Sequence, residues 1–207
     1  SKNTISRPTR TSVGEFNGIY YTTLSTNNLI EKNKIINPFG GIPTSTSPFY
    51  GINFNSTSAL TGEDNIIQNN VIAANNGNGI QYGIFNTSSN NIWYFHNTIA
   101  LENPTATTTQ ATRGFYQTGT AGGLLFYNNI ININRNGNGT KHCIYVSTTT
   151  LFSDNNDYYI NPASTNHIGF FTSNRTTLQN WQTASSQDAA SLSFPPVFSS
   201  AATFDYT

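Results

Sequence analysis

Two repeat units of this sequence place a basic side chain near a tyrosine at matching positions. Arg113 is followed three residues later by Tyr116, and His142 is followed in the same way by Tyr145. An arginine can neutralise a uronate carboxylate, and a neutral His or a deprotonated Tyr can act as the base that removes the C5 proton, as an elimination from an acidic polysaccharide requires. These four residues are therefore the candidate catalytic residues of a polysaccharide lyase. The alternative is that they are ordinary members of a polar sheet face.

The two tyrosines also belong to a column of mainly aromatic residues that recurs once per unit. The pattern predicts that this column faces outward, and its members are Tyr20, Asn53, Phe85, Tyr116, Tyr145 and Phe171. Rings one strand spacing apart, roughly 4.8 Å, would form a ribbon on which sugars stack. The predicted ligand-binding residues are Tyr20, Phe85, Tyr116, Tyr145 and Phe171. The alternative is that the rings pack against one another and only stabilise the sheet.

Other site chemistries find little support in the sequence. Hydrolases of polysaccharides need closely spaced carboxylates, whereas the acidic residues here are scattered and Glu63-Asp64 is the only adjacent pair. Calcium sites need several converging acidic ligands. The three histidines lack the dense spacing of a zinc site; they are His96, His142 and His167. We therefore expect neither a metal nor a cofactor.

The elements that would position these residues follow from two interleaved columns. The first is an Asn with an apolar residue two places later, and it recurs about every 30 residues, as one coil of a solenoid would. Its members are Asn3, Asn33, Asn70, Asn97, Asn129 and Asn156. The second column is a small residue followed by a bulky apolar one, at Gly18, Gly51, Gly83, Gly114, Cys143 and Gly169. Apolar residues alternate with a period of two after each Asn, which indicates strands.

This double pattern resembles the right-handed parallel β-helix family, the pectin-lyase-like superfold, over about residues 3 to 172. The resemblance implies an all-β solenoid of about six coils, built from residues 1–173. It also implies that the six Asn side chains turn inward at a bend and stack as a structural ladder, each amide bonding the backbone of the bend. Loops between the ladder Asn and the next small residue are expected on one side of the solenoid.

Both ends of the chain suggest special roles. Asn3 is already in register, so residues 1–17 either continue a longer solenoid or form an irregular cap. Residues 174–207 lose the repeat and are expected to cap the same domain. A short helix is predicted from Thr176 or Thr177 to about Ser185, followed by an extended segment at Pro195-Pro196. Trp181 and Phe198 are predicted to cover the last coil.

Composition narrows the function classes. The 207 residues contain nine Lys plus Arg and nine Asp plus Glu, so the formal net charge is zero. This balance argues against nucleic-acid binding, and no apolar run approaches the length of a membrane span. One Cys cannot form an internal disulfide, and the absence of Met indicates a processed or excised piece. Low charge with abundant Asn, Thr, Ser and Gly is typical of exported solenoids.

These observations predict a noncatalytic module of a larger exported protein, located outside the cell or on its surface. Its role would be structural or glycan-binding, with a polysaccharide or neighbouring domains of the parent protein as partners. The lyase described above is the enzymatic alternative. Ice binding through the Thr-rich segments 105–109 and 147–150 is a weaker third possibility, because these residues are consecutive rather than aligned between coils.

Overall fold

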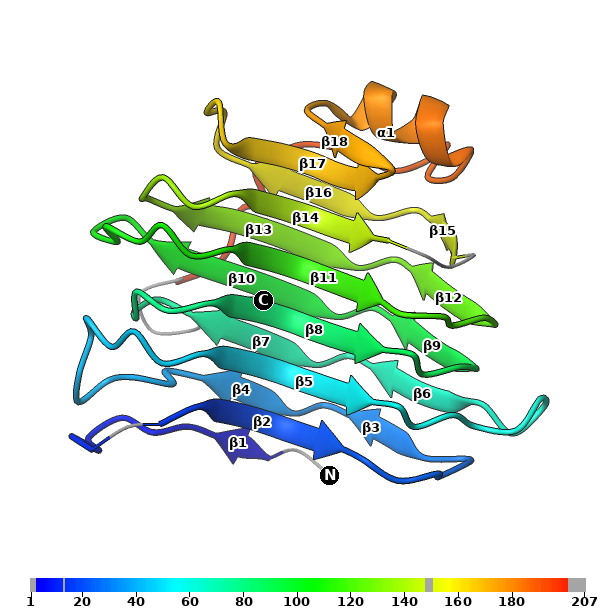
Figure 1. The fold of residues 1–207 in the computed structure, drawn as a ribbon, viewed down its shortest axis with the longest axis horizontal. Helices are drawn as coiled ribbons and strands as arrows, with labels where there is room; N and C mark the ends of the chain where they lie inside the picture. The colour runs from blue at the N-terminus through cyan, green and yellow to red at the C-terminus, as the bar shows by residue number, and fades with distance from the viewer. Residues whose placement is uncertain (1–2, 13, 148–150, 201–207) are drawn as a thin grey trace.

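A computed structural model describes residues 3–12, 14–147 and 151–200, and it shows a parallel β-solenoid with three sheets (Figure 1). Sheet A contains β1 (Thr4–Ile5), β4 (Lys34–Ile36), β7 (Val71–Ala74), β10 (Thr98–Asn103), β13 (Ile130–Arg135) and β16 (Asp157–Ile160). Sheet B contains β2 (Phe16–Tyr21), β5 (Phe49–Asn55), β8 (Gln81–Thr87), β11 (Thr112–Thr118), β14 (Lys141–Val146), β17 (Asn166–Phe171) and β18 (Ser173–Arg175). Sheet C contains β3 (Leu29–Glu31), β6 (Asn65–Gln68), β9 (Ile92–Phe95), β12 (Leu124–Tyr127) and β15 (Leu151–Asp154).

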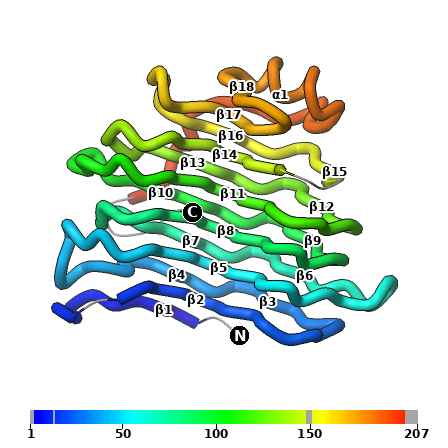
Figure 2. Tube along the Cα trace, in the orientation of Figure 1, coloured from blue at the N-terminus to red at the C-terminus, as the bar shows by residue number. Residues whose placement is uncertain are grey.

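Each coil runs from sheet B through sheet C to sheet A and then rises to the next coil. In Figures 1 and 2 the strands of sheet B cross the front from left to right, and the chain returns behind them along sheet A, which makes the coil right-handed. The chain completes about five turns, because sheet C has five strands while β1 and β17 belong to incomplete turns at the two ends. The predicted solenoid is therefore confirmed, with about five turns in place of the predicted six or so.

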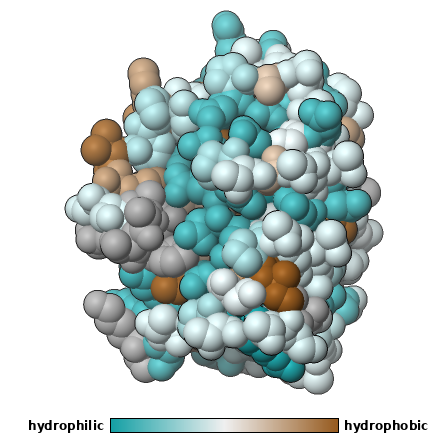
Figure 3. Space-filling view, turned by 90° about the vertical axis from the view of Figure 1, so that its left-hand side faces the viewer, coloured by the Kyte–Doolittle hydropathy of each residue, from teal (hydrophilic) through white to brown (hydrophobic). Residues whose placement is uncertain are grey.

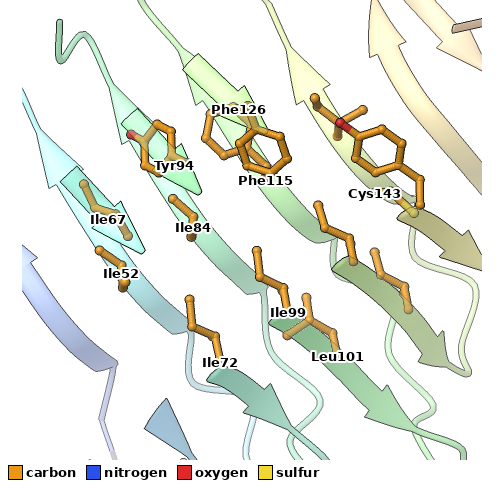
Figure 4. Packing of buried hydrophobic residues seen from close by; sticks show 14 of the residues in the cluster. Ile52, Ile67, Ile72, Ile84, Tyr94, Ile99, Leu101, Phe115, Phe126 and Cys143 are labelled. Carbon is orange, nitrogen blue, oxygen red and sulfur yellow. The ribbon is translucent and has the colours of Figure 1, made fainter. Parts of the chain in front are cut away.

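The core lies between the three sheets and is built by the inward residues of each strand. Ile84, Ile99 and Phe115 are fully buried in it, and so are Tyr94 and Phe126 (Figure 4). Alternation along the strands produces this arrangement, since successive side chains point to opposite faces. In β9, for example, Ile92 and Tyr94 are buried, while Trp93 and Phe95 face outward. A continuous apolar file therefore runs along the solenoid axis.

The glycine column exists because sheet A and the next strand of sheet B both approach the backbone closely at these positions. A Cβ at Gly83 would lie 2.4 Å from Cγ2 of Ile99 and 2.7 Å from the carbonyl oxygen of Gly114. Gly51 and Gly114 are equally confined, and Cys143 is the only larger residue in the predicted column. Its thiol lies 3.4 Å from the carbonyl oxygen of Tyr159, so it is a buried packing group.

The last position of this column was predicted wrongly. Gly169 pairs with Ile144, so Ile168 and not Gly169 lies opposite Cys143. The reason is the cap: a Cβ at Gly169 would lie 2.3 Å from a ring carbon of Trp181. Gly169 therefore makes room for the indole rather than for the next coil.

The asparagine ladder is confirmed along its whole length. Each side-chain amide donates to the Oδ1 of the next Asn, over N···O distances of 3.0 to 3.2 Å from Asn3 to Asn156. The same Oδ1 accepts the backbone N–H of the preceding ladder Asn, as Asn97 does from Asn70 at 3.1 Å. From Asn33 onward, the residue before each ladder Asn bends the chain with φ between 52° and 57°, at Lys32, Asn69, His96, Asn128 and Asn155. Asn and His tolerate this left-handed conformation better than most residues.

The ladder ends on a buried carboxylate that the sequence analysis did not single out. Oδ1 of Asp188 accepts hydrogen bonds from Nδ2 of Asn156 at 2.9 Å, from the Ser153 hydroxyl at 2.9 Å and from the Ser191 hydroxyl at 2.6 Å. Oδ2 of Asp188 accepts the indole N–H of Trp181 at 2.7 Å. Several donors stabilise a buried carboxylate in the absence of an opposite charge. Asp188 therefore joins the cap to the last coil.

The C-terminal segment forms the predicted helix, α1 (Leu178–Ser185), with Thr177 as its N-cap. Trp181 is 1% exposed and covers the last coil as expected. Phe198 does not: it packs on the outer face of sheet A against Ala73 and Ala100. The segment passes the end of the solenoid at Leu192, which bridges to Asp157, and then descends along sheet A. Residues 201–207 of the predicted cap lie outside the described residues, as do residues 148–150 of the second Thr-rich segment.

The turns that lead from sheet A to sheet B gather on one side, as predicted, and this side is mainly hydrophilic (Figure 3). Two of these turns have the sequence Asn-Gly-Asn-Gly, at residues 76–79 and 136–139, and each is bound by a buried cation. Arg135 donates to the carbonyls of Gly77 and Gly79 at 2.8 and 2.9 Å, and Lys141 donates to the carbonyl of Gly137 at 2.7 Å. Burial lowers the pKa of Arg135 to about 10. Within the described residues no helix is long and apolar enough to cross a membrane.

Candidate functional site

The predicted aromatic column lies on the outer face of sheet B, with one correction. Strand pairing aligns Tyr20 with Asn53, then Phe85, Tyr116 and Tyr145. The next member is Phe170, not Phe171, because the register of β17 differs by one residue from the predicted one. Phe171 instead packs against the core cluster. Asn53 is buried and interrupts the column, so Tyr20 is separate from the four rings above it.

The rings of this column pack against one another. The centroids of Phe85 and Tyr116 are 4.9 Å apart with planes 14° from parallel, and those of Tyr145 and Phe170 are 4.1 Å apart with planes 2° from parallel. Tyr50, from the neighbouring column, stacks on Phe85 at 5.7 Å. Stacking of this kind stabilises the sheet. It also places ring faces against other rings, so that these faces cannot receive a sugar.

Arg113 lies where the two stacked pairs meet, Phe85 with Tyr116 and Tyr145 with Phe170. The rings of Tyr116 and Tyr145 meet edge to face, and the guanidinium carbon of Arg113 lies 3.8 Å from the centroid of each. The guanidinium is thus held by cation–π contacts with both tyrosines. Its Nε atom is buried without a hydrogen-bond partner among the described residues. Arg113 therefore acts first as a packing group of sheet B.

His142 is near Arg113, as predicted, but it is only 2% exposed. Its Nε2 lies 2.9 Å from Oδ1 of Asn174 in β18, and its ring is 5.1 Å from that of His167. Burial lowers the pKa of His142 to about 4, with a further contribution from the positive charge of Arg113 and from His167, while the Asn174 contact opposes the shift. Burial also lowers the pKa of His167. His142 is therefore neutral at pH 7 and largely shielded from solvent.

The four lyase candidates thus come together, yet the arrangement differs from an open site. A general base must reach the proton that it removes, and the buried ring of His142 is covered by neighbouring side chains. Arg113 contacts two tyrosine rings where a lyase would need it to face a carboxylate. The cluster is better described as the polar centre of a continuous stack.

A second face, on the outside of sheet C, was missed by the sequence analysis. Strand pairing forms one column from Leu29, Ile66, Trp93, Leu125 and Phe152. The column beside it contains Glu31, Gln68, Phe95, Tyr127 and Asp154. The signal was present in the alternation of Ile92–Phe95 and Leu124–Tyr127, where every second residue is bulky and faces outward.

The rings of this second face are not stacked. The planes of Trp93 and Phe95 are 45° apart with centroids 5.9 Å apart, and those of Phe95 and Tyr127 are 55° and 6.2 Å apart. Leu29 is 55% exposed and Phe152 is 50% exposed. Contiguous apolar surface of this kind often marks a binding site. We call these ten residues of the two columns the sheet C face.

Polar groups border the sheet C face where the chain bends toward sheet A. A shallow depression of about 280 Å³ lies at this bend, between the end of sheet C and the C-terminal segment, and is lined by Asn128, Asn155 and Asp157, among others. Glu31 and Asp154 stand near the two ends of the second column, and Lys32 lies 3.6 Å from the Glu31 carboxylate. The face therefore combines an apolar row with hydrogen-bonding groups along one side.

The described residues contain no group of three His, Cys, Asp or Glu side chains that could hold a metal ion. Comparison with known proteins assigns no family: no family model matches the chain, and neither the curated proteins nor the solved structures contain a significant match. The fold is that of a parallel β-solenoid, and membership of the pectin-lyase-like superfold stays a prediction.

Proposed function

We propose that this protein is a noncatalytic glycan-binding module whose binding surface is the sheet C face. The observation that carries the proposal is the row of unstacked side chains centred on Trp93, with Phe95 and Tyr127 tilted beside it. Sugars pack their C–H faces against aromatic and aliphatic surface while their hydroxyl groups bond polar neighbours. The amides and carboxylates along the border of the face supply such neighbours.

The contrast between the two aromatic faces supports this choice. On sheet B the rings of Tyr145 and Phe170 are 2° from parallel and cover one another, whereas on sheet C the neighbouring rings diverge by 45° or more. A ring whose face is already packed gains little by meeting a ligand. Binding on sheet C therefore requires no rearrangement of the stack on sheet B.

An extracellular or cell-surface location fits a glycan ligand and the low charge of the chain. It is part of the proposal, as is the view that the module belongs to a larger exported protein. The lyase alternative receives less support, because His142 is buried and Arg113 is held between tyrosines. Its products would nevertheless be seen in the experiment described next.

The experiment is native-gel retention by a panel of neutral and acidic polysaccharides. The Trp93→Ala variant removes the centre of the face, and Tyr20→Ala is the matched control, since it deletes an exposed ring from sheet B. We expect retention by at least one polysaccharide, its loss in Trp93→Ala and its persistence in Tyr20→Ala, with unchanged circular dichroism in both.

Two results would contradict the proposal. The first is that no polysaccharide in the panel retains the intact protein. The second is retention that survives Trp93→Ala but is lost in Tyr20→Ala, which would return the site to sheet B. Incubation with pectate or alginate is followed in parallel by ultraviolet absorbance. Unsaturated products that His142→Ala abolishes would establish the lyase instead.

A further inference from the structure

We infer that the ligand of the sheet C face is a neutral, flat, β-linked glycan chain that lies along the solenoid axis, across the strands. This inference rests on the proposed function and specifies its ligand. Three observations carry it: the dimensions of the face, the charges along it and the repeat of its columns.

The face is long and narrow. Its first column extends over five strands from Leu29 to Phe152, or four spacings of roughly 4.8 Å each, giving about 19 Å. The two outward columns are separated by roughly 7 Å, because every second residue faces outward. A face of these dimensions offers far less than the roughly 800 Å² per partner that a stable dimer buries. A single extended polymer fits it better than a second copy of the chain.

The charges favour a neutral polymer. Both carboxylates of the face, Glu31 and Asp154, belong to the second column, and neither column contains a Lys or Arg. Lys32, beside the face, pairs with Glu31. Arg113 lies on sheet B, and Arg135 and Lys141 are buried in the turns. A uronate or sulfate on the sheet C face would therefore approach two carboxylates, and the cation beside the face, Lys32, is already paired with Glu31.

The repeat of the columns sets the direction of the chain. One apolar residue is presented per coil in the first column, so an axial ligand meets a new contact every strand spacing. A pyranose unit in an extended β-1,4-linked chain advances by a similar distance and shows a flat C–H face. A chain that ran along the strands would cross only two outward columns and would use only one or two sugar units.

The test compares cello-oligosaccharides of two to six units with their C6-oxidised forms, which differ only in carrying carboxylates. Binding is followed by tryptophan fluorescence, since Trp93 lies at the centre of the face. We expect affinity for the neutral series to rise with each unit and to level off at four or five. Oxidised chains should bind about threefold more weakly or worse for each carboxylate near Glu31, and Glu31→Gln should narrow the difference.

The outcomes separate this inference from the proposed function. Equal or tighter binding of the oxidised chains overturns the inference, and so does affinity that stops rising at two units. Retention of the protein by other glycans, with no binding of the cello-oligosaccharides, also overturns it while leaving the proposed function in place. If no glycan binds at all, both are wrong. In Phe152→Ala the affinity is expected to stop rising at an oligosaccharide about one unit shorter. A site confined to Trp93 would not show this change.

Discussion

Replacement of Asn97 by Leu tests how much the ladder contributes to stability. The Oδ1 atom of Asn97 accepts the backbone N–H of Asn70 and its side-chain amide, at 3.1 and 3.0 Å. Its Nδ2 donates to the carbonyl of Ile67 at 2.9 Å and to Oδ1 of Asn129 at 3.0 Å. Leucine has nearly the same shape but offers none of these bonds.

The expected loss follows from the groups left behind. The backbone N–H of Asn70 and the carbonyl of Ile67 lose their bonds to residue 97, whereas the Asn70 amide keeps the carbonyl of Ile30 and Oδ1 of Asn129 keeps the backbone N–H of residue 97. Each buried group without its partner costs about 1–3 kcal/mol, so the loss of two partners should lower the free energy of unfolding by about 2–6 kcal/mol.

The assay is urea unfolding followed by circular dichroism, with the midpoint and the slope fitted separately. Asn3→Leu is the control, because it makes the same change at the exposed end of the ladder, and we expect it to cost less than about 1 kcal/mol. Equal midpoints for the intact protein and Asn97→Leu would refute the reasoning. A loss in Asn3→Leu as large as that in Asn97→Leu would refute it as well.

Three further predictions concern the glycine column, the cap and the histidine pair. Gly83→Ala should lower the free energy of unfolding by about 1–3 kcal/mol through contact with a fixed backbone oxygen, whereas Gly122→Ala, with open space around it, should not; equal urea midpoints for the two would contradict this. Asp188→Asn, which turns an amide N–H₂ toward groups that donate, should cost about 2–4 kcal/mol, and a thermal melt equal to that of the intact protein would show that the carboxylate is dispensable. Because the pKa of His142 is lowered to about 4, the unfolded chain binds a proton that the folded chain excludes, so stability should fall from about pH 6.5 to pH 4 by up to about 3 kcal/mol. His142→Gln should flatten this dependence in urea titrations, and an unchanged slope would contradict the assignment.

The repeat made the solenoid predictable because its two constraints act on single residues. A bend that needs an inward amide selects Asn97 and its equivalents, and a Cβ that would strike a backbone oxygen selects Gly83 and its equivalents. The register failed at Gly169, where the neighbour is Trp181 from the cap and not another coil. Repeat logic cannot anticipate a contact that occurs once.

The candidate site was less predictable for a similar reason. The outward column of sheet B was found from its spacing in the sequence. Spacing does not reveal whether neighbouring rings stack or diverge, because this depends on the angles between ring planes, such as the 2° between Tyr145 and Phe170. The sheet C face was overlooked because its strands lack a marker residue as constant as the glycine. Asp188 lies in the non-repeating segment, so no column pointed to it.

The ladder also gives the solenoid a direction. Every ladder amide donates a hydrogen bond to the Asn of the next coil, so an internal coil accepts one such bond and donates another. The series ends where Asn156 donates to the carboxylate of Asp188. Each coil is therefore equivalent with respect to the ladder: excision of residues 70–96 would join Asn69 to Asn97 and leave both ends of the ladder as they are, while Arg135 would lose the carbonyls of Gly77 and Gly79. The ladder can then lengthen or shorten by one coil at a time and still end on the same carboxylate, whereas the contacts of the turns must be rebuilt for each length.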